Sequence, residues 1–155
     1  VVIRNGELYR EKTYKDVCVL YFDGTMETFT KNEFDIDSAI AKKAWQAWSF
    51  GPELMKDGYP VEEFDSSVSD KNPRCGIGYY EPGHYCLVVV DGRQPGYSSG
   101  MTLAEFSSLF YSLGCNTAYN LDGGATAQMM FQDQRINLPS GGGRESSDII
   151  FFGVG

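Results

Sequence analysis

Residues 85–124 read YCLVVVDGRQPGYSSGMTLAEFSSLFYSLGCNTAYNLDGG, with two apolar runs on either side of a helical pattern. Its apolar opening predicts a strand buried on both faces, and the apolar residues 117–121 predict a second strand. Between them, Thr102 and Glu105 have the spacing of a capping box, in which the two side chains satisfy free N–H groups at a helix start. Apolar residues then recur with helical spacing up to Gly114, which suits the left-handed position after a helix. The order is therefore strand, helix (residues 102–113), strand.

Short strands surround this stretch on both sides. Asn5-Gly6 and Asp23-Gly24 are typical of tight hairpin turns, and EPGH at residues 81–84 indicates a third hairpin. A short helix is expected over residues 37–44 and a polar loop over residues 57–73. The expected strands are residues 1–3, 8–10, 17–22, 25–30, 75–80, 85–90, 117–121, 125–131, 135–138 and 148–152, with a further strand within residues 45–54. The pattern predicts an α+β fold, a mixed and largely antiparallel β-sheet system with few helices, in one domain over residues 1–155.

The composition is that of a folded, acidic protein. Hydrophobic residues make up 42% of the chain and aromatic residues 14%, and the formal net charge is -8. Such acidity disfavours sequence-independent binding to nucleic acid, and the chain has no polybasic patch to attract an anionic membrane. No run of eighteen apolar residues predicts a membrane span, and no signal peptide is visible in the sequence.

The cysteines and the single histidine argue against a metal site. Cys18, Cys75, Cys86 and Cys115 contain no Cys-x-x-Cys pair, so zinc spacing is absent. Free thiols are favoured, and one disulfide is the alternative. Cys86 and Cys115 lie in apolar segments and are expected to be buried. His84 lies in a turn, which disfavours a Ser-His-Asp triad or a multi-histidine metal site. No cofactor is expected.

Two apolar strands end alike, each with an aspartate followed by a glycine. Residues 85–93 deliver Asp91-Gly92 and residues 117–124 deliver Asp122-Gly123. A rigid strand end positions a carboxylate well, and the glycine allows a sharp turn or the close approach of a ligand. If both strands share a sheet, both aspartates open onto one cleft. The alternative is that each Asp-Gly only forms a turn.

Three arginines accompany these strand ends. Arg74 lies in NPRCGIG, Arg93 follows Asp91-Gly92, and Arg144 lies in a glycine-rich loop. If they converge, they form an anion pocket, because the guanidinium fork matches the oxygens of a phosphate. The alternative is that each arginine pairs with a surface carboxylate.

Several segments of the chain together resemble a known family. NPRCGIG, SSDIIFFG and DGRQPGYSSGMTLAEFSSLFYSLGCNTAYNLDGGATAQM resemble the phosphodiester glycosidase family, which includes N-acetylglucosamine-1-phosphodiester alpha-N-acetylglucosaminidase. VVIRNGELYRE and WQAWSFGPEL are similar to its bacterial branch, whose members are often described as related to exopolysaccharide biosynthesis. The resemblance covers nearly the whole chain and implies a family domain that lacks its N-terminal segment.

The resemblance implies hydrolysis of a sugar-1-phosphodiester on an extracellular or cell-envelope glycan. The broken bond joins the anomeric carbon to a phosphate oxygen. The implied carboxylate roles fall to Asp122 and Asp91. The implied substrate-binding residues are Arg74, Arg93, Asn120, Gly123, Gly124, Thr126, Arg144 and Asp148, with Arg74 and Arg93 at the phosphate.

Three departures from the family pattern support a second hypothesis. Ala125-Thr126 stands where the family usually has Gly-Ser, Cys75 stands in place of a threonine, and Arg144-Glu145 reverses the usual Glu-Arg order. These changes, with the missing N-terminal segment, are compatible with a non-catalytic module that binds envelope carbohydrate. A third, weaker hypothesis is an envelope assembly factor that acts through protein contacts.

Overall fold

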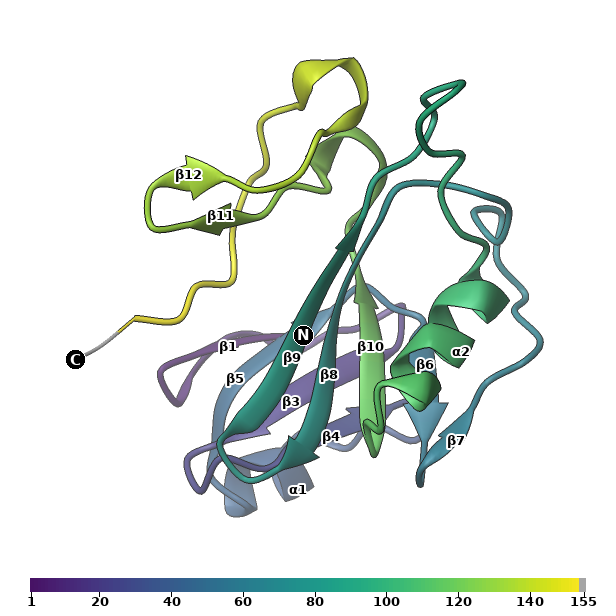
Figure 1. Cartoon of the computed structure of the whole chain (residues 1–155). Helices are drawn as coiled ribbons and strands as arrows, with labels where there is room; N and C mark the ends of the chain where they lie inside the picture. Colours follow the sequence, from purple (N-terminus) through teal and green to yellow (C-terminus); the bar gives the residue numbers. More distant parts are fainter. Residues whose placement is uncertain (154–155) are drawn as a thin grey trace.

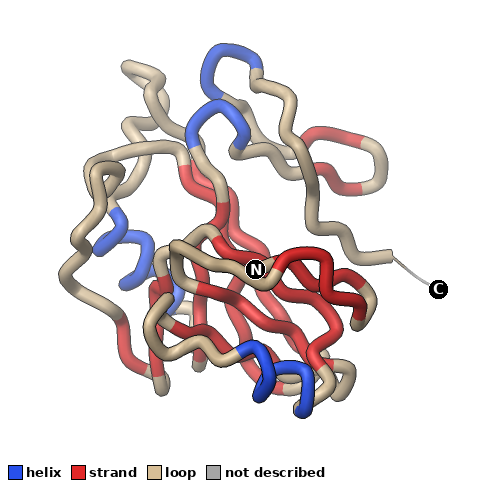
Figure 2. The backbone as a smooth tube through the Cα atoms, turned by 180° about the vertical axis from the view of Figure 1, so that it is seen from behind, coloured by secondary structure: helices blue, strands red, loops and turns tan. Residues whose placement is uncertain are grey.

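The computed structural model describes residues 1–153 and consists of four layers (Figures 1 and 2). Sheet A has the strand order β2-β1-β5-β3-β4, and sheet B has the order β7-β6-β10-β8-β9. Helix α1 packs on the outer face of sheet A, and helix α2 packs on the outer face of sheet B. All strand pairs in the described residues are antiparallel, so the expected α+β class is confirmed.

The elements have the following bounds. Sheet A contains β1 (Val2–Arg4), β2 (Glu7–Arg10), β3 (Val17–Tyr21), β4 (Met26–Phe29) and β5 (Ala44–Ser49). Sheet B contains β6 (Glu53–Lys56), β7 (Tyr59–Pro60), β8 (Arg74–Glu81), β9 (His84–Val90) and β10 (Thr117–Leu121). A small separate hairpin is formed by β11 (Met130–Phe131) and β12 (Gln134–Arg135). The helices are α1 (Ile36–Ala41), α2 (Leu103–Ser112) and the short 3-10 turns η1 (Gly124–Thr126) and η2 (Ser140–Gly142).

Strand β3 is buried on both faces because it lies inside sheet A with a packed layer on each side. Its alternate residues Val17 and Val19 pack towards α1, while Cys18 and Leu20 pack towards sheet B. This period of two is the geometry of an extended chain, in which neighbouring side chains point to opposite faces. The middle apolar layer joins the two sheets into one core.

Tyr119 of β10 connects the two sheets through its hydroxyl group. The side chain is fully buried in the layer between the sheets. Its hydroxyl donates to the Asp16 carbonyl at 2.6 Å and accepts from the Phe50 N–H at 2.7 Å. Both backbone groups flank strands of sheet A, so one buried phenol makes two hydrogen bonds to the backbone of the opposite sheet.

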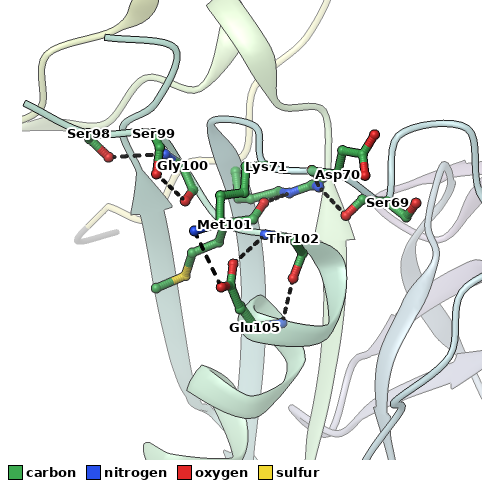
Figure 3. A network of polar contacts seen from close by, with 10 residues as sticks. Ser69, Asp70, Lys71, Ser98, Ser99, Gly100, Met101, Thr102 and Glu105 are labelled. Atoms are coloured by element: carbon green, nitrogen blue, oxygen red, sulfur yellow. Dashed lines mark hydrogen bonds and ion pairs between the residues drawn. The ribbon is translucent and has the colours of Figure 1, made fainter. Parts of the chain in front are cut away.

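The helix predicted over residues 102–113 is confirmed as α2. Thr102 caps its start, and the Thr102 hydroxyl and the Glu105 carboxylate make the reciprocal hydrogen bonds of a capping box (Figure 3). Phe106 and Phe110 face sheet B, and their rings pack edge to face with their centroids 4.9 Å apart. Within the described residues, neither helix has the length and apolar character needed to cross a membrane.

Three strand predictions were wrong. The run at residues 85–90 is not buried on both faces, because β9 is the edge strand of sheet B and Leu87 is 40% exposed. Residues 125–131 do not form one strand, because the chain turns at Gly124 into η1 and is extended again only at β11. Residues 148–152 pair with no strand of the described chain and run as exposed coil.

Smaller differences concern the first helix and the loops. The short helix starts earlier than expected, because the carboxylate of Asp35 accepts from the Ser38 N–H and makes Asp35 the N-cap. The predicted loop over residues 57–73 contains the short strand β7, and residues 135–138 leave the strand conformation after Arg135.

Replacement of Tyr119 by phenylalanine tests the link between the sheets. Tyr119→Phe removes both hydrogen bonds to the partly buried Asp16 carbonyl and Phe50 N–H, so we expect a loss of about 0.5–1.5 kcal/mol in unfolding free energy. Tyr111→Phe is the matched control, since Tyr111 is 55% exposed on α2. Chemical denaturation of both variants measures the difference. Equal stability of the two would show that the hydroxyl does not join the sheets.

Candidate functional site at one end of sheet B

The register of β8 with its two neighbours brings the aspartate-bearing strand ends together. Cys75 of β8 pairs with Leu121 of β10, and Arg74 pairs with Val90 of β9. Asp122 and Asp91 are the next residues along those two strands. Both aspartates therefore lie beyond the same end of sheet B, as the sequence predicted.

Gly123 allows this part of the chain to pack directly on the start of β8. The Gly124 N–H donates to the Pro73 carbonyl at 3.0 Å. A Cβ atom at Gly123 would lie 2.5 Å from the same carbonyl oxygen, so a side chain cannot fit there. The Asp-Gly-Gly sequence thus fixes the position of Asp122 through backbone contact.

Asp91 holds two loops together with its carboxylate. One oxygen accepts from Asn137 Nδ2 at 2.8 Å. The other accepts from the Tyr97 hydroxyl at 3.0 Å and from the Leu138 N–H at 2.9 Å. Both oxygens are engaged, so Asp91 acts in this structure as the anchor of the loops that follow β9 and β12.

Asn137 extends this anchor to the segment that follows Asp122. Its Nδ2 also donates to the Ala127 carbonyl at 2.9 Å, and its Oδ1 accepts from the Met129 N–H at 2.9 Å. One amide side chain therefore holds η1 and its exit against Asp91. Sequence reasoning missed Asn137 and Tyr97, because an isolated asparagine or tyrosine in a loop carries no signal of its role.

Asp122 differs from Asp91 because its carboxylate is open to solvent. Its side chain is 52% exposed, and Arg144 Nη2 lies 3.8 Å from its Oδ2. Arg144 is held by its backbone, because its N–H donates to the Ala125 carbonyl and its carbonyl accepts from Gln128 Nε2, each at 3.0 Å. The guanidinium of Arg144 is itself 66% exposed. Both charged groups are therefore accessible to a ligand.

Arg93 lies against the same glycine turn. Its Nε and Nη2 donate to Asn72 Oδ1 at 3.1 and 2.7 Å. Its Nη1 lies 3.2 Å from the position that a Cβ atom on Gly124 would occupy. Asn72, which the sequence did not single out, thus aims this exposed arginine at the backbone that follows Asp122.

Arg74 and Asn120, both predicted from the sequence as substrate ligands, lie inside the protein in this structure. Arg74 is 3% exposed, and its guanidinium donates to four backbone carbonyls, those of Met101, Val68, Ser69 and Asp70 (the last three at 2.5–3.3 Å). Burial, and then the charge of Arg93, lower the pKa of Arg74. Figure 3 shows how Ser69, Asp70 and Met101 come together beside the start of α2.

Asn120 is also 3% exposed, and its Nδ2 donates to the Gly51 carbonyl at 2.8 Å. Its Oδ1 is buried without a partner in the described residues. The Nδ2 bond ties β10, the strand that leads to Asp122, to the segment before β6.

Of the two remaining predicted residues, Thr126 lies at the site and Asp148 does not. Thr126 lies in η1, where its hydroxyl donates to the Gly123 carbonyl at 2.7 Å and closes the turn. Asp148 lies elsewhere, because its carboxylate pairs with Arg4 of β1 at 3.3 Å. The structure therefore groups Asp122, Arg93, Arg144 and the Gly123-Gly124 backbone, with Asp91 as support, and leaves Asp148 outside.

The thiol beside Asp122 is not suited to nucleophilic attack. All four cysteines are free, and Cys115 is buried as expected, whereas Cys86 is only partly buried. Burial, and then the Asp122 carboxylate, raise the pKa of Cys75 to about 11. The thiolate is the reactive form of cysteine, so Cys75 is almost wholly uncharged near neutral pH.

The exposed groups together suit an anionic sugar derivative. Two guanidinium groups, of Arg93 and Arg144, lie around a glycine turn and one free carboxylate. Guanidinium groups bind phosphate oxygens, and a carboxylate stabilises positive charge or activates water on a neighbouring atom. Fold and site thus define a four-layer α+β domain with a carboxylate-and-arginine site at a sheet end.

Comparison with known proteins identifies the family. The phosphodiester glycosidase family matches residues 1–153, and the chain belongs to this family. A relative in Bacillus subtilis (strain 168), the SPbeta prophage-derived uncharacterized protein YomE, is 36% identical over 148 residues. That match covers 90% of this chain but 23% of the relative, so the chain spans less than a quarter of its length.

Solved structures share the fold at lower identity. The catalytic domain of zebrafish N-acetylglucosamine-1-phosphodiester alpha-N-acetylglucosaminidase, auto-inhibited by its pro-peptide, matches with a TM-score of 0.68 and 21% identity. This match covers 90% of the present chain and 50% of the zebrafish one. A hypothetical protein from Synechocystis matches with a TM-score of 0.51 and 16% identity, over 81% of this chain and 31% of that one.

The two aspartates are expected to respond differently to removal of their charge. Asp91→Asn puts an amide where three donors converge, so we expect a loss of about 1–3 kcal/mol in unfolding free energy. Asp122→Asn removes an exposed charge with one distant ion pair, and its effect should stay within about 0.5 kcal/mol. Denaturant titration of both variants measures the contrast. The assignment of roles would be wrong if Asp122→Asn were the more destabilising change.

The raised pKa of Cys75 can be tested by measuring how the alkylation rate of its thiol changes with pH. Because its pKa is raised to about 11, we expect its alkylation by iodoacetamide to keep accelerating between pH 8 and pH 11. The measurement uses a Cys86→Ser variant and peptide mass spectrometry, so that the modified residue is unambiguous. A rate that levels off by about pH 9.5, one unit above the usual thiol pKa of about 8.5, would indicate an ordinary thiol.

Proposed function

We propose that this chain binds a sugar-1-phosphodiester at the end of sheet B and hydrolyses the bond between the anomeric carbon and a phosphate oxygen. The observation that carries the proposal is the solvent-exposed carboxylate of Asp122, which has the Arg144 guanidinium 3.8 Å away and the Arg93 guanidinium against the following Gly124. Membership of the phosphodiester glycosidase family supports the same reaction class.

Phosphate binding is assigned to Arg93 and Arg144. Both side chains are exposed. The Arg93 guanidinium is positioned by its hydrogen bonds to Asn72, and Arg144 is positioned by hydrogen bonds of its backbone N–H and carbonyl. Their charges would stabilise the phosphate as negative charge develops on it during bond cleavage. A phosphomonoester is already a good leaving group, so the reaction needs less proton donation than the cleavage of an ordinary glycoside.

The carboxylate of Asp122 is assigned to the sugar. An anomeric centre that loses its phosphate becomes oxocarbenium-like, and a nearby carboxylate stabilises that charge, attacks it or activates water. Asp91 does not touch the substrate in this proposal. It binds Asn137, which in turn holds the segment that follows Asp122. The proposed context is an extracellular or envelope glycan, such as an exopolysaccharide that carries phosphodiester-linked sugars.

A second candidate function is a carbohydrate-binding module without turnover. It is favoured by the engagement of both Asp91 oxygens, which leaves Asp122 as the open carboxylate of the pair. Most glycosidases use two carboxyl groups. Ala125 and Cys75, which replace a glycine and a threonine of the family pattern, point in the same direction.

Hydrolysis is tested with the methyl phosphodiester of N-acetylglucosamine-1-phosphate, by measuring released sugar. Asp122→Asn should lower the rate about a thousandfold or more, a barrier increase of roughly 4 kcal/mol, while the protein stays folded. Asp133→Asn is the matched control, because Asp133 is an exposed aspartate in the β11–β12 turn. Equal rates for the two variants would remove Asp122 from the reaction.

Binding without hydrolysis separates the two candidates. If the unmutated chain releases no sugar but binds the phosphodiester saturably by calorimetry, the module is the better description. In that case Arg144→Ala should weaken binding about tenfold or more, and binding should also weaken at high salt, because screening reduces the attraction between charges.

A further inference from the structure

A second cluster of reactive side chains lies on the α2 face of sheet B, away from the end of the sheet that carries the two aspartates. Cys86 of β9 and Cys115, in the connection between α2 and β10, pack in the same apolar cluster. Cys86 lies directly across from Gly78 of β8. A Cβ atom on Gly78 would be 2.6 Å from Cys115 Sγ, so this sulfur lies over the same glycine.

Gly78 is therefore the reason that two thiols can meet on this face. Its missing side chain leaves a notch that the Cys115 sulfur fills, and the next strand presents Cys86 beside that notch. Residues directly opposite each other on antiparallel strands have their Cβ atoms about 4.5–5.5 Å apart. The sulfur of Cys86 is thus within reach of the sulfur that stands over Gly78.

Tyr80 provides a second observation that both thiols share one site. Tyr80 of β8 packs in the same cluster as Cys86 and Cys115. The Cys115 thiol, and then the Cys86 thiol, raise the pKa of the Tyr80 hydroxyl. All three side chains thus belong to one cluster on the α2 face of sheet B. The other two cysteines lie elsewhere, Cys18 between the sheets and Cys75 at the Asp122 end of β8.

We propose that Cys86 and Cys115 are a redox-active thiol pair, which a small-molecule disulfide oxidises to an intramolecular disulfide. The bond would join the edge strand β9 to the connection that leads from α2 into β10. In the structure described here both cysteines are free, so this is the reduced form. The proposal does not depend on the proposed hydrolysis.

The chemistry is a pair of thiol–disulfide exchanges. Cys86 is partly exposed, so its thiolate attacks one sulfur of the small disulfide, forms a mixed disulfide and releases one small thiol. Cys115 then attacks the Cys86 sulfur and releases the second small thiol. Two protein thiols are oxidised, one disulfide is reduced, and the two protons end on the released thiols.

The second exchange should be the slower one. Burial raises the pKa of Cys115 to about 11, so little of it is thiolate near neutral pH. Its position beside Cys86 offsets this, because the attack is intramolecular. Oxidation should therefore be slow but complete, and it should accelerate as the pH rises from 7 towards 9.

The test is treatment of the whole chain with excess oxidised glutathione. Thiols counted in denaturant should fall from four to two, and reduction by dithiothreitol should restore four. Because the bond closes a loop of about 30 residues, the oxidised protein should melt roughly 5 °C higher than the reduced one. Persistence of four thiols would overturn the proposal.

Peptide mapping identifies the pair. Trypsin cuts after Arg74, Arg93 and Arg135, which places Cys75 and Cys86 in one peptide and Cys115 in the next. A Cys75→Ser background resolves this overlap, and the expected product is residues 75–93 linked to residues 94–135. A disulfide that involves Cys18, or a link that is absent in this background, would contradict the assignment.

Matched serine variants complete the test. Cys115→Ser should stop at the mixed disulfide with glutathione on Cys86, and Cys86→Ser should keep all three of its thiols over the same period. Cys18→Ser should still form the bond. A mixed disulfide on Cys86 that accumulates equally in the unmutated chain would show that Cys115 cannot reach it.

Discussion

The pairing of β8 with β9 on one side and β10 on the other is the constraint on which the site depends. Backbone hydrogen bonds fix the register of three strands, so the residues that follow Val90 and Leu121 must emerge at the same end of the sheet. The side chains there add little to this placement. Gly123 contributes by having none, because its backbone rests directly on the Pro73 carbonyl.

Two aspartates that look equivalent in the sequence have opposite physical situations. Asp91 is surrounded by donors from two loops, whereas Asp122 faces solvent beside Arg144. The difference arises because the loops after β9 and β12 fold back onto Asp91, while the chain after Asp122 turns away through η1. The placement of a carboxylate at a strand end therefore does not decide its role, and the surrounding donors do.

The sequence allowed most of the fold to be predicted, because its signals are local. Hairpin dipeptides, the Thr102–Glu105 capping box and the apolar period of α2 each depend on a few neighbouring residues. The errors concern tertiary relations: β9 was expected inside a sheet because its apolar run resembles a central strand, yet it lies at an edge. At the site, the shared sheet end was predictable from two Asp-Gly motifs. The burial of Arg74 and Asn120 was not, because charge and polarity do not reveal which carbonyls surround a side chain.

The environment of Arg74 has a consequence for how the sequence can vary. Its guanidinium holds the loop around Val68, Ser69 and Asp70 by their carbonyl groups alone. Every residue type supplies a carbonyl, so these contacts hold the path of the loop backbone whichever side chains stand at the three positions. The loop can therefore change its chemical surface through substitution while it keeps its path. Arg74 itself has no such freedom, because lysine lacks the planar fork that contacts several carbonyls at once.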